Sequence, residues 1–159
     1  MRKSVEEKHN YSLKGLVYDK QGGFLYSIQA PLRGYTFLTK WDAKNNFTPI
    51  NSIEISDSIC TSIDYSPRFD LLAMADCKGS LIYVDPSGQM SKIKEVFLSE
   101  ITLKSIAFKN ENLVSGAADN ALQLNYIYKP SLIRFTFVFK ILFLVIFAYY
   151  LFLRFSNKI

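Results

Sequence analysis

The chain has 159 residues and a mass of 18.2 kDa, which is enough for one ordinary domain, with or without a membrane anchor. Hydrophobic residues make up 49% and aromatic residues 15% of it, which excludes a disordered chain. The formal net charge is +5, but residues 131–159 hold four basic residues and no acidic one, so residues 1–130 are nearly neutral. A nucleic-acid-binding domain normally carries a concentrated basic patch, so we expect no nucleic-acid partner.

Residue types that carry most bond-making chemistry are scarce in this chain. His9 is the only histidine, and Cys60 and Cys77 are the only cysteines, too few for histidine-based catalysis or a disulfide framework. None of the phosphate-loop, nucleophile-elbow or zinc-protease motifs occurs. Three neighbouring acidic residues lack the glycine and glutamate of a calcium loop: Asp57, Asp64 and Asp70. We therefore expect no catalytic residue, cofactor, metal site or small-molecule substrate.

After an N-terminal segment, residues 1–12, the chain reads as a repeat of short strands. Three stretches share one pattern, a strand that ends in an aromatic residue, a polar turn and a second strand: 15–26, 61–73 and 104–115. The aromatic residues Tyr18, Tyr65 and Phe108 are 47 and 43 residues apart. A period of about 40–45 residues with several short strands per unit indicates the blades of a β-propeller.

Further strands complete each unit. Third strands are expected at 35–42, 80–85 and 122–125, and fourth strands at 47–55 and 93–98. The sequence thus predicts an all-β region, residues 13–128, with blades at 13–55, 57–98 and 101–127, the last incomplete. The dipeptide Trp41-Asp42 closes its strand where a WD repeat carries its signature. We interpret Asp76 and Asp119, which open turns, as carboxylates that bond local backbone rather than as functional acids.

The C-terminal residues predict a membrane anchor at 131–154, followed by a short tail, 155–159. Phe135 to Leu153 is a run of 19 residues with one charge, Lys140, and as a helix it would span about 28 Å. Lys140 lies close enough to one end to reach the interface, and Tyr149 and Tyr150 suit the other. A buried core helix is the alternative, but the run has no polar stripe to expose.

The expected topology follows from the anchor. The N-terminus lacks the apolar stretch of a signal peptide, so we expect residues 1–130 in the cytosol and the tail in the lumen. Glycan on either sequon, Asn10-Tyr11-Ser12 or Asn46-Phe47-Thr48, would contradict this assignment. In a reducing compartment we expect the two cysteines to be packing residues of strands.

The junction between the last unit and the anchor resembles one known family. Residues 101–108 and 113–124 are similar to the final blade and pre-membrane strand of the Sec-twelve family, also called the prolactin regulatory element-binding protein family. The resemblance covers about residues 57–153. Members of this family are WD-repeat proteins of the endoplasmic reticulum membrane. They load GTP onto the small GTPase Sar and so start COPII coat assembly for transport to the Golgi. The resemblance implies a single-pass protein of that membrane, with a Sar-type GTPase as partner.

The chain also departs from this family. It holds about three blades where the family has seven, so it is expected to be the C-terminal part of a longer product, a truncated gene model, or one half of a pairing with another chain. Nothing in it matches the family's exchange loop with its bound potassium ion, so no exchange residue carries over, and we expect little exchange activity. The alternative function is a membrane-tethered WD-repeat scaffold without exchange activity.

Overall fold

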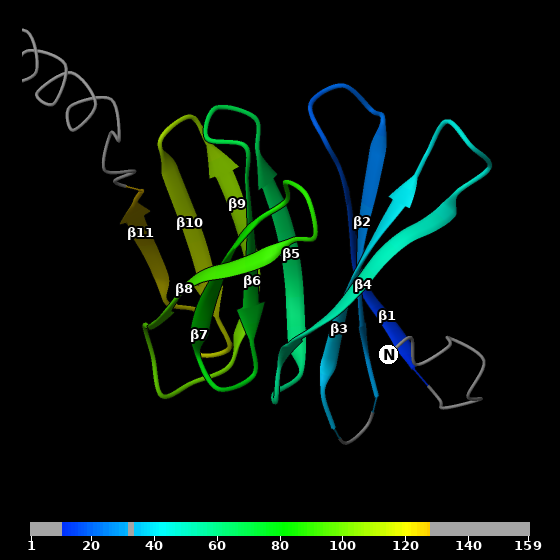
Figure 1. The fold of residues 1–159 in the computed structure, drawn as a ribbon. Helices are drawn as coiled ribbons and strands as arrows, with labels where there is room; N and C mark the ends of the chain where they lie inside the picture. Colours follow the sequence, from blue (N-terminus) through cyan, green and yellow to red (C-terminus); the bar gives the residue numbers. More distant parts are fainter. Residues whose placement is uncertain (1–10, 32–33, 128–159) are drawn as a thin grey trace, which may run out of the picture. The chain divides into compact units, whose positions relative to one another are not determined.

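The structure is a computed structural model that describes residues 11–31 and 34–127, and it consists there of strands and turns (Figure 1). The expected all-β architecture in antiparallel sheets is confirmed for these residues. Contacts divide the chain into two compact units, 1–127 and 128–159. The predicted anchor and tail lie outside the described residues, as does most of the N-terminal segment. Within the described part, no helix is long and apolar enough to cross a bilayer.

Within residues 11–31 and 34–127, eleven strands form three sheets in which neighbouring strands follow one another along the chain. The first sheet contains β1 (Ser12–Tyr18), β2 (Phe24–Ala30), β3 (Thr36–Asp42) and β4 (Thr48–Ser56). The second contains β5 (Cys60–Ser66), β6 (Leu71–Asp76), β7 (Ser80–Asp85) and β8 (Ser91–Phe97). The third contains β9 (Leu103–Lys109), β10 (Asn112–Ala117) and β11 (Leu122–Tyr126).

The turn between the first two strands of each sheet contains a residue with a positive φ. Gly22, Asp70 and Asn110 occupy these turns with φ of 65°, 48° and 57°. Glycine, aspartate and asparagine are the residues that tolerate this left-handed backbone conformation best. The polar turns recognised in the sequence therefore lie where the backbone requires them.

The register between strands is the same in all three sheets. In the second sheet, Ile63, Met74 and Ile82 lie opposite one another on the first three strands. The equivalent residues are Leu16, Ser27 and Thr39 in the first sheet and Ile106, Ser115 and Gln123 in the third. Because side chains alternate across a strand, each sheet has two faces with equivalent positions.

We call the two faces of each sheet rear and forward. The rear faces are Leu16, Tyr18, Leu25, Ser27, Thr39 and Trp41 in the first sheet; Ile63, Tyr65, Leu72, Met74, Ile82 and Val84 in the second; and Ile106, Phe108, Leu113, Ser115, Gln123 and Asn125 in the third. The forward faces are Gly15, Val17, Tyr26, Ile28, Leu38 and Lys40; Ser62, Asp64, Ala73, Ala75, Leu81 and Tyr83; and Ser105, Ala107, Val114, Gly116, Leu122 and Leu124.

The core consists of forward faces packed on rear faces. One cluster joins the forward face of the first sheet, including Ile28 and Leu38, to the rear face of the second, including Ile63 and Met74. A second cluster joins the forward face of the second sheet to the rear face of the third. The approach is close: a Cβ atom on Gly15 would lie 2.8 Å from the Cγ2 atom of Ile63. Glycine at this position therefore sets how near the first two sheets can lie.

Hydrogen bonds between the innermost strands add to this packing. The first strands of successive sheets, β1, β5 and β9, lie beside one another. The carboxylate of Asp64 accepts a hydrogen bond from the Phe108 backbone N–H at 2.6 Å, and the hydroxyl of Thr61 donates to the Leu103 carbonyl at 2.5 Å. These bonds fix the third sheet against the second at its inner edge.

Two faces are not covered by another sheet within the described residues. On the rear face of the first sheet, Leu16 is 52% exposed and Tyr18 is 49% exposed, whereas Ser27 and Thr39 at its centre are buried. On the forward face of the third sheet, Leu122 is 78% exposed and Leu124 is 52% exposed. The second sheet, in contrast, is covered on both faces.

Candidate functional site

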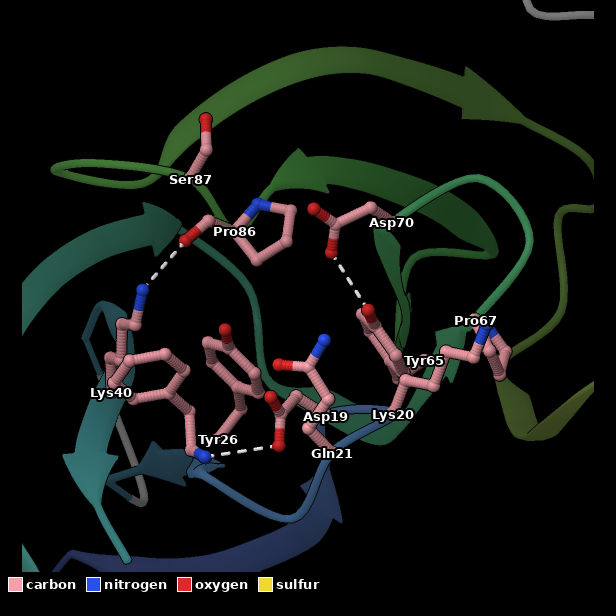
Figure 2. Close-up of a pocket in the computed structure, with 11 residues that line it drawn as sticks. Asp19, Lys20, Gln21, Tyr26, Lys40, Tyr65, Pro67, Asp70, Pro86 and Ser87 are labelled. Carbon is pink, nitrogen blue, oxygen red and sulfur yellow. Dashed lines mark hydrogen bonds between the residues drawn. The ribbon is translucent and has the colours of Figure 1, made fainter.

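A pocket lies where turns of the first and second sheets meet (Figure 2). It has a volume of about 380 Å³. Its lining comes from the first turn of both sheets, the facing side chains of β2, β3 and β5, and the β7–β8 turn: Asp19, Lys20, Gln21, Phe24, Tyr26, Lys40, Tyr65, Pro67, Asp70, Pro86 and Ser87. The pocket therefore depends on the docking of two sheets and exists in neither alone.

Asp19 shapes the wall that the first sheet contributes. Its Oδ1 atom accepts a hydrogen bond from the Phe24 backbone N–H at 3.0 Å, and its own N–H donates to the Phe24 carbonyl at 3.0 Å. These two bonds close the β1–β2 turn and hold the Asp19 carboxylate at the pocket. Asp19 therefore both stabilises the turn of the β1–β2 hairpin and gives the pocket a negative charge.

Lys40 is a buried cation at the side of the pocket. It lies on the forward face of β3 and is only 8% exposed. Its ammonium donates to the Pro86 carbonyl at 3.0 Å and lies 4.2 Å from the centroid of the Phe24 ring and 5.8 Å from that of Tyr26 (Figure 2). The aromatic wall thus already stabilises one positive charge through its π faces.

Two tyrosines, one from each sheet, form the back of the pocket. The rings of Tyr26 and Tyr65 are stacked, with centroids 6.5 Å apart and planes inclined by 17°. The Tyr65 hydroxyl donates to the Oδ1 atom of Asp70 at 2.7 Å. Burial, together with this hydrogen bond, raises the pKa of Tyr65 to about 12. Burial and then the negative charges of Asp19 and Asp70 raise the pKa of Tyr26 further above its usual value.

The pocket offers several polar groups to a ligand. Its polar groups are two carboxylates, two ammonium groups, two phenols, an amide and a hydroxyl. In the part of the chain that the structure describes, no group of three histidine, cysteine, aspartate or glutamate side chains is placed to hold a metal ion. Stacked rings between carboxylates are suited to holding a positively charged group.

Asp76 lies in the fold as a turn carboxylate, away from the pocket. It is fully buried at the end of β6, where its Oδ1 atom accepts from the backbone N–H groups of Lys78 and Ser80 at 3.0 and 2.7 Å. Its Oδ2 atom accepts from the Ser58 hydroxyl. The carboxylate thus ties the β6–β7 turn to the segment that enters the second sheet.

Exposed Asp119 repeats part of this bonding, with Oδ1 accepting from the Ala121 N–H at 3.0 Å. Asp42, of the Trp41-Asp42 dipeptide, accepts from two backbone N–H groups of the following turn, and Trp41 donates from its indole to the Ser27 hydroxyl at 2.8 Å. Asp85, one repeat later, accepts from the Ser87 N–H at 2.8 Å. These aspartates therefore stabilise turns in successive sheets by accepting hydrogen bonds from backbone N–H groups.

The other sequence candidates are scattered. Asp57 pairs with Lys78, with 2.9 Å between Oδ1 and Nζ, Asp64 joins two sheets, and Asp70 belongs to the pocket. Both cysteines are free thiols. Cys60 is buried in β5, where burial raises its pKa to about 12, but Cys77 lies in the β6–β7 turn and is only half-buried. The expectation of a strand position was therefore wrong for Cys77. His9 lies outside the described residues.

The pocket itself was not anticipated from the sequence. One signal was available: Lys40 follows Leu38 on the forward face of β3, and a charge that becomes buried needs a partner. Its partner is a carbonyl 46 residues away, in the second sheet. Only the docking of the two sheets reveals that partner.

The comparisons with known proteins find likeness in structure only. No family model matches the sequence, and no curated protein matches it. Among solved structures, it is similar to a chain in a crystal structure of the mitotic checkpoint complex, with a TM-score of 0.67 and 16% identity over 77% of this chain and 38% of that one.

Two further solved structures are similar. One is a structure of U3-55K, with a TM-score of 0.64 and 14% identity over 77% of this chain and 40% of that one. The other is a crystal structure of RRP9 WD40 repeats, with a TM-score of 0.63 and 13% identity over 77% and 39%. The chain thus spans about two fifths of the length of these relatives. Its described residues have the fold of WD40 repeats.

Proposed function

We propose that this chain is a membrane-tethered WD-repeat interaction module that binds a basic side chain of a partner protein in the pocket between its first two sheets. The observation that carries the proposal is the pair of stacked tyrosines, Tyr26 and Tyr65, between the carboxylates of Asp19 and Asp70. The tether is the apolar run at 135–153, and its support is the sequence pattern alone.

The charges of the pocket favour a cation from outside. Lys40 is already engaged by a carbonyl and by the Phe24 ring, so its charge is partly satisfied within the fold. Burial is the largest cause of the raised pKa values of both tyrosines, and the carboxylates of Asp19 and Asp70 add to it, so it is these two carboxylates that favour a positive charge in the pocket. Lys20 also lines the pocket, so a partner's side chain must reach the tyrosines past one like charge.

A selection from short random peptides tests the pocket. We expect the purified chain to enrich peptides that contain arginine or lysine, and the enrichment to be lost in Asp70→Asn. Asparagine tolerates the backbone φ of 48° at this position and can still accept from Tyr65, so the substitution removes charge with little change of shape. Asp119→Asn, an exposed turn carboxylate in the third sheet, is the matched control. Equal enrichment by all three proteins would refute the site.

A narrower function follows from the resemblance to the Sec-twelve family. Under it, the module would act on a Sar-type GTPase at the endoplasmic reticulum membrane, as an exchange factor for COPII vesicle formation. Its support is the similarity of residues 101–108 and 113–124 to that family's last blade and pre-membrane strand. Such exchange needs a surface that holds the nucleotide-free GTPase and requires no covalent chemistry.

Release of fluorescent GDP from a Sar GTPase, measured with the chain in lipid vesicles, tests this narrower function. We expect at most weak acceleration, because no segment matches the family's exchange loop. Binding of the GTPase without acceleration would favour the scaffold, and absence of binding would exclude Sar as the partner. For the tether, deletion of 131–159 should release the chain from carbonate-washed membranes, whereas retention would contradict the anchor.

A further inference from the structure

The two uncovered faces belong to one repeated interface. The rear faces of the second and third sheets contribute to the core, and the rear face of the first sheet carries similar residues at three equivalent positions, Leu16, Tyr18 and Leu25. Leu16 corresponds to buried Ile63 and Ile106, and Leu25 corresponds to Leu72 and Leu113. The face is built for burial against a forward face, although no sheet within the described residues covers it.

The forward face of the third sheet is the matching half. Leu122 corresponds to Leu81, which is fully buried in the interface between the second and third sheets. Gly116 corresponds to Ala75, so the middle of this face stays small, as it does where the second sheet receives the third. The two central rows of each uncovered face carry no charged residue, so contact between them would bury no unpaired charge. The flanking rows add Lys109 to the forward face of the third sheet and Glu54 to the rear face of the first.

We propose that the forward face of the third sheet packs on the rear face of the first sheet of a second copy, and that two copies so joined close a ring of six sheets. The contact is heterologous, since a forward face always meets a rear face, and two such contacts cover both faces that are uncovered within residues 11–31 and 34–127. Six sheets lie within the range of four to eight found in closed propellers. The second copy is chosen because its first sheet supplies the rear face whose equivalents this chain already buries twice.

The closed ring also suits the proposed tether. Rotation about the ring axis leaves corresponding ends of both chains on the same side of the ring. Ile127, the last described residue, would therefore lie on the same side of the ring in both copies, which is compatible with two anchors in one bilayer. Burial of the exposed leucines would remove the apolar surface that otherwise favours aggregation.

Mass measurement of the full chain in detergent, with detergent mass subtracted, is the first test. We expect a dimer for the wild type and a monomer for both Leu16→Glu and Leu122→Glu. Each contact joins one forward face to one rear face, so a substitution in either face disrupts both contacts of the dimer. Ile93→Glu, the same change at a site 57% exposed on the outer strand β8, is the control and should remain dimeric. A monomeric wild type, or an open series of larger assemblies, would overturn the proposal.

Mixing the two variants provides a second test that does not depend on loss of assembly. Leu16→Glu retains an intact forward face and Leu122→Glu an intact rear face, so the mixture should form a mixed dimer through one contact. A face that paired with itself would give no such rescue. Rescue also shows that both variants are folded, and its absence, with both variants giving the circular dichroism of the wild type, would refute the head-to-tail contact.

Discussion

At the scale of single residues, Asp76 is a buried carboxylate that stabilises the second sheet. It is fully buried and accepts hydrogen bonds from one hydroxyl and two backbone N–H groups. Asp76→Ala leaves these donors without a partner, so we expect the free energy of unfolding to fall by about 2–3 kcal/mol. Urea unfolding followed by circular dichroism measures the change. Asp119→Ala, exposed and with one backbone partner, should cost well under half as much; equal losses would contradict this reading.

Tyr65 makes stability depend on alkaline pH. Its pKa is about 12 in the fold and near 10 in an unfolded chain, so between these values the unfolded state binds fewer protons. Its contribution is therefore complete below about pH 10 and is lost as the pH rises to about 12. We expect the unfolding free energy of the wild type to fall more steeply over this window than that of Tyr65→Phe. Absorbance of tyrosinate at alkaline pH provides a direct check, since the substitution should remove one late-titrating group.

At the scale of elements, Gly79 decides how the second sheet meets the segment that leaves it. Its φ is 85°, and a Cβ atom there would lie 1.7 Å from the carbonyl oxygen of Ser99. Gly79→Ala should therefore lower the free energy of unfolding by about 3 kcal/mol or more. Alanine is strained at this φ, and the backbone at Ser99 must also move to make room for its Cβ atom. Gly88→Ala is the control, with φ of 53° and open space around it, and should cost about 1 kcal/mol. Similar melting temperatures for the two variants would contradict the role of Gly79.

The strands were predictable from the sequence because their cues are local. Alternation, β-branched residues and turn residues such as Asp70 and Asn110 mark where each strand begins and ends. The pocket was not predictable, because Lys40 finds its carbonyl partner 46 residues away and the tyrosines meet only when two sheets dock. Cys77 shows the same limit, since one residue decided between the end of β6 and the following turn. Local pattern thus predicts elements, and it does not predict what they bring together.

At the scale of the whole molecule, several polar contacts hold the third sheet and the segment that enters it to the second sheet. The Asp64 carboxylate accepts from the Phe108 N–H and is among them. Asp64→Ala should speed amide hydrogen exchange in β9, β10 and β11 while leaving β1–β4 unchanged, because each sheet is stabilised mainly by its neighbours. Asp57→Ala, which removes an exposed ion pair with Lys78, is the control and should leave exchange unaltered. Uniform acceleration across all sheets would indicate one cooperative unit instead.

The shared register has a consequence for how this chain can change in evolution. Every sheet presents a rear face and a forward face at the same positions, so removal of one whole repeat brings together faces of the same two kinds. Loss of part of a repeat, in contrast, would shift the alternation of side chains and expose a core face. Changes of length that preserve the fold are therefore expected in steps of a whole sheet. Duplication or deletion of the gene segment between the linkers near residues 57–59 and 98–102 would add or remove one sheet and leave the packing between the remaining sheets of the same kind.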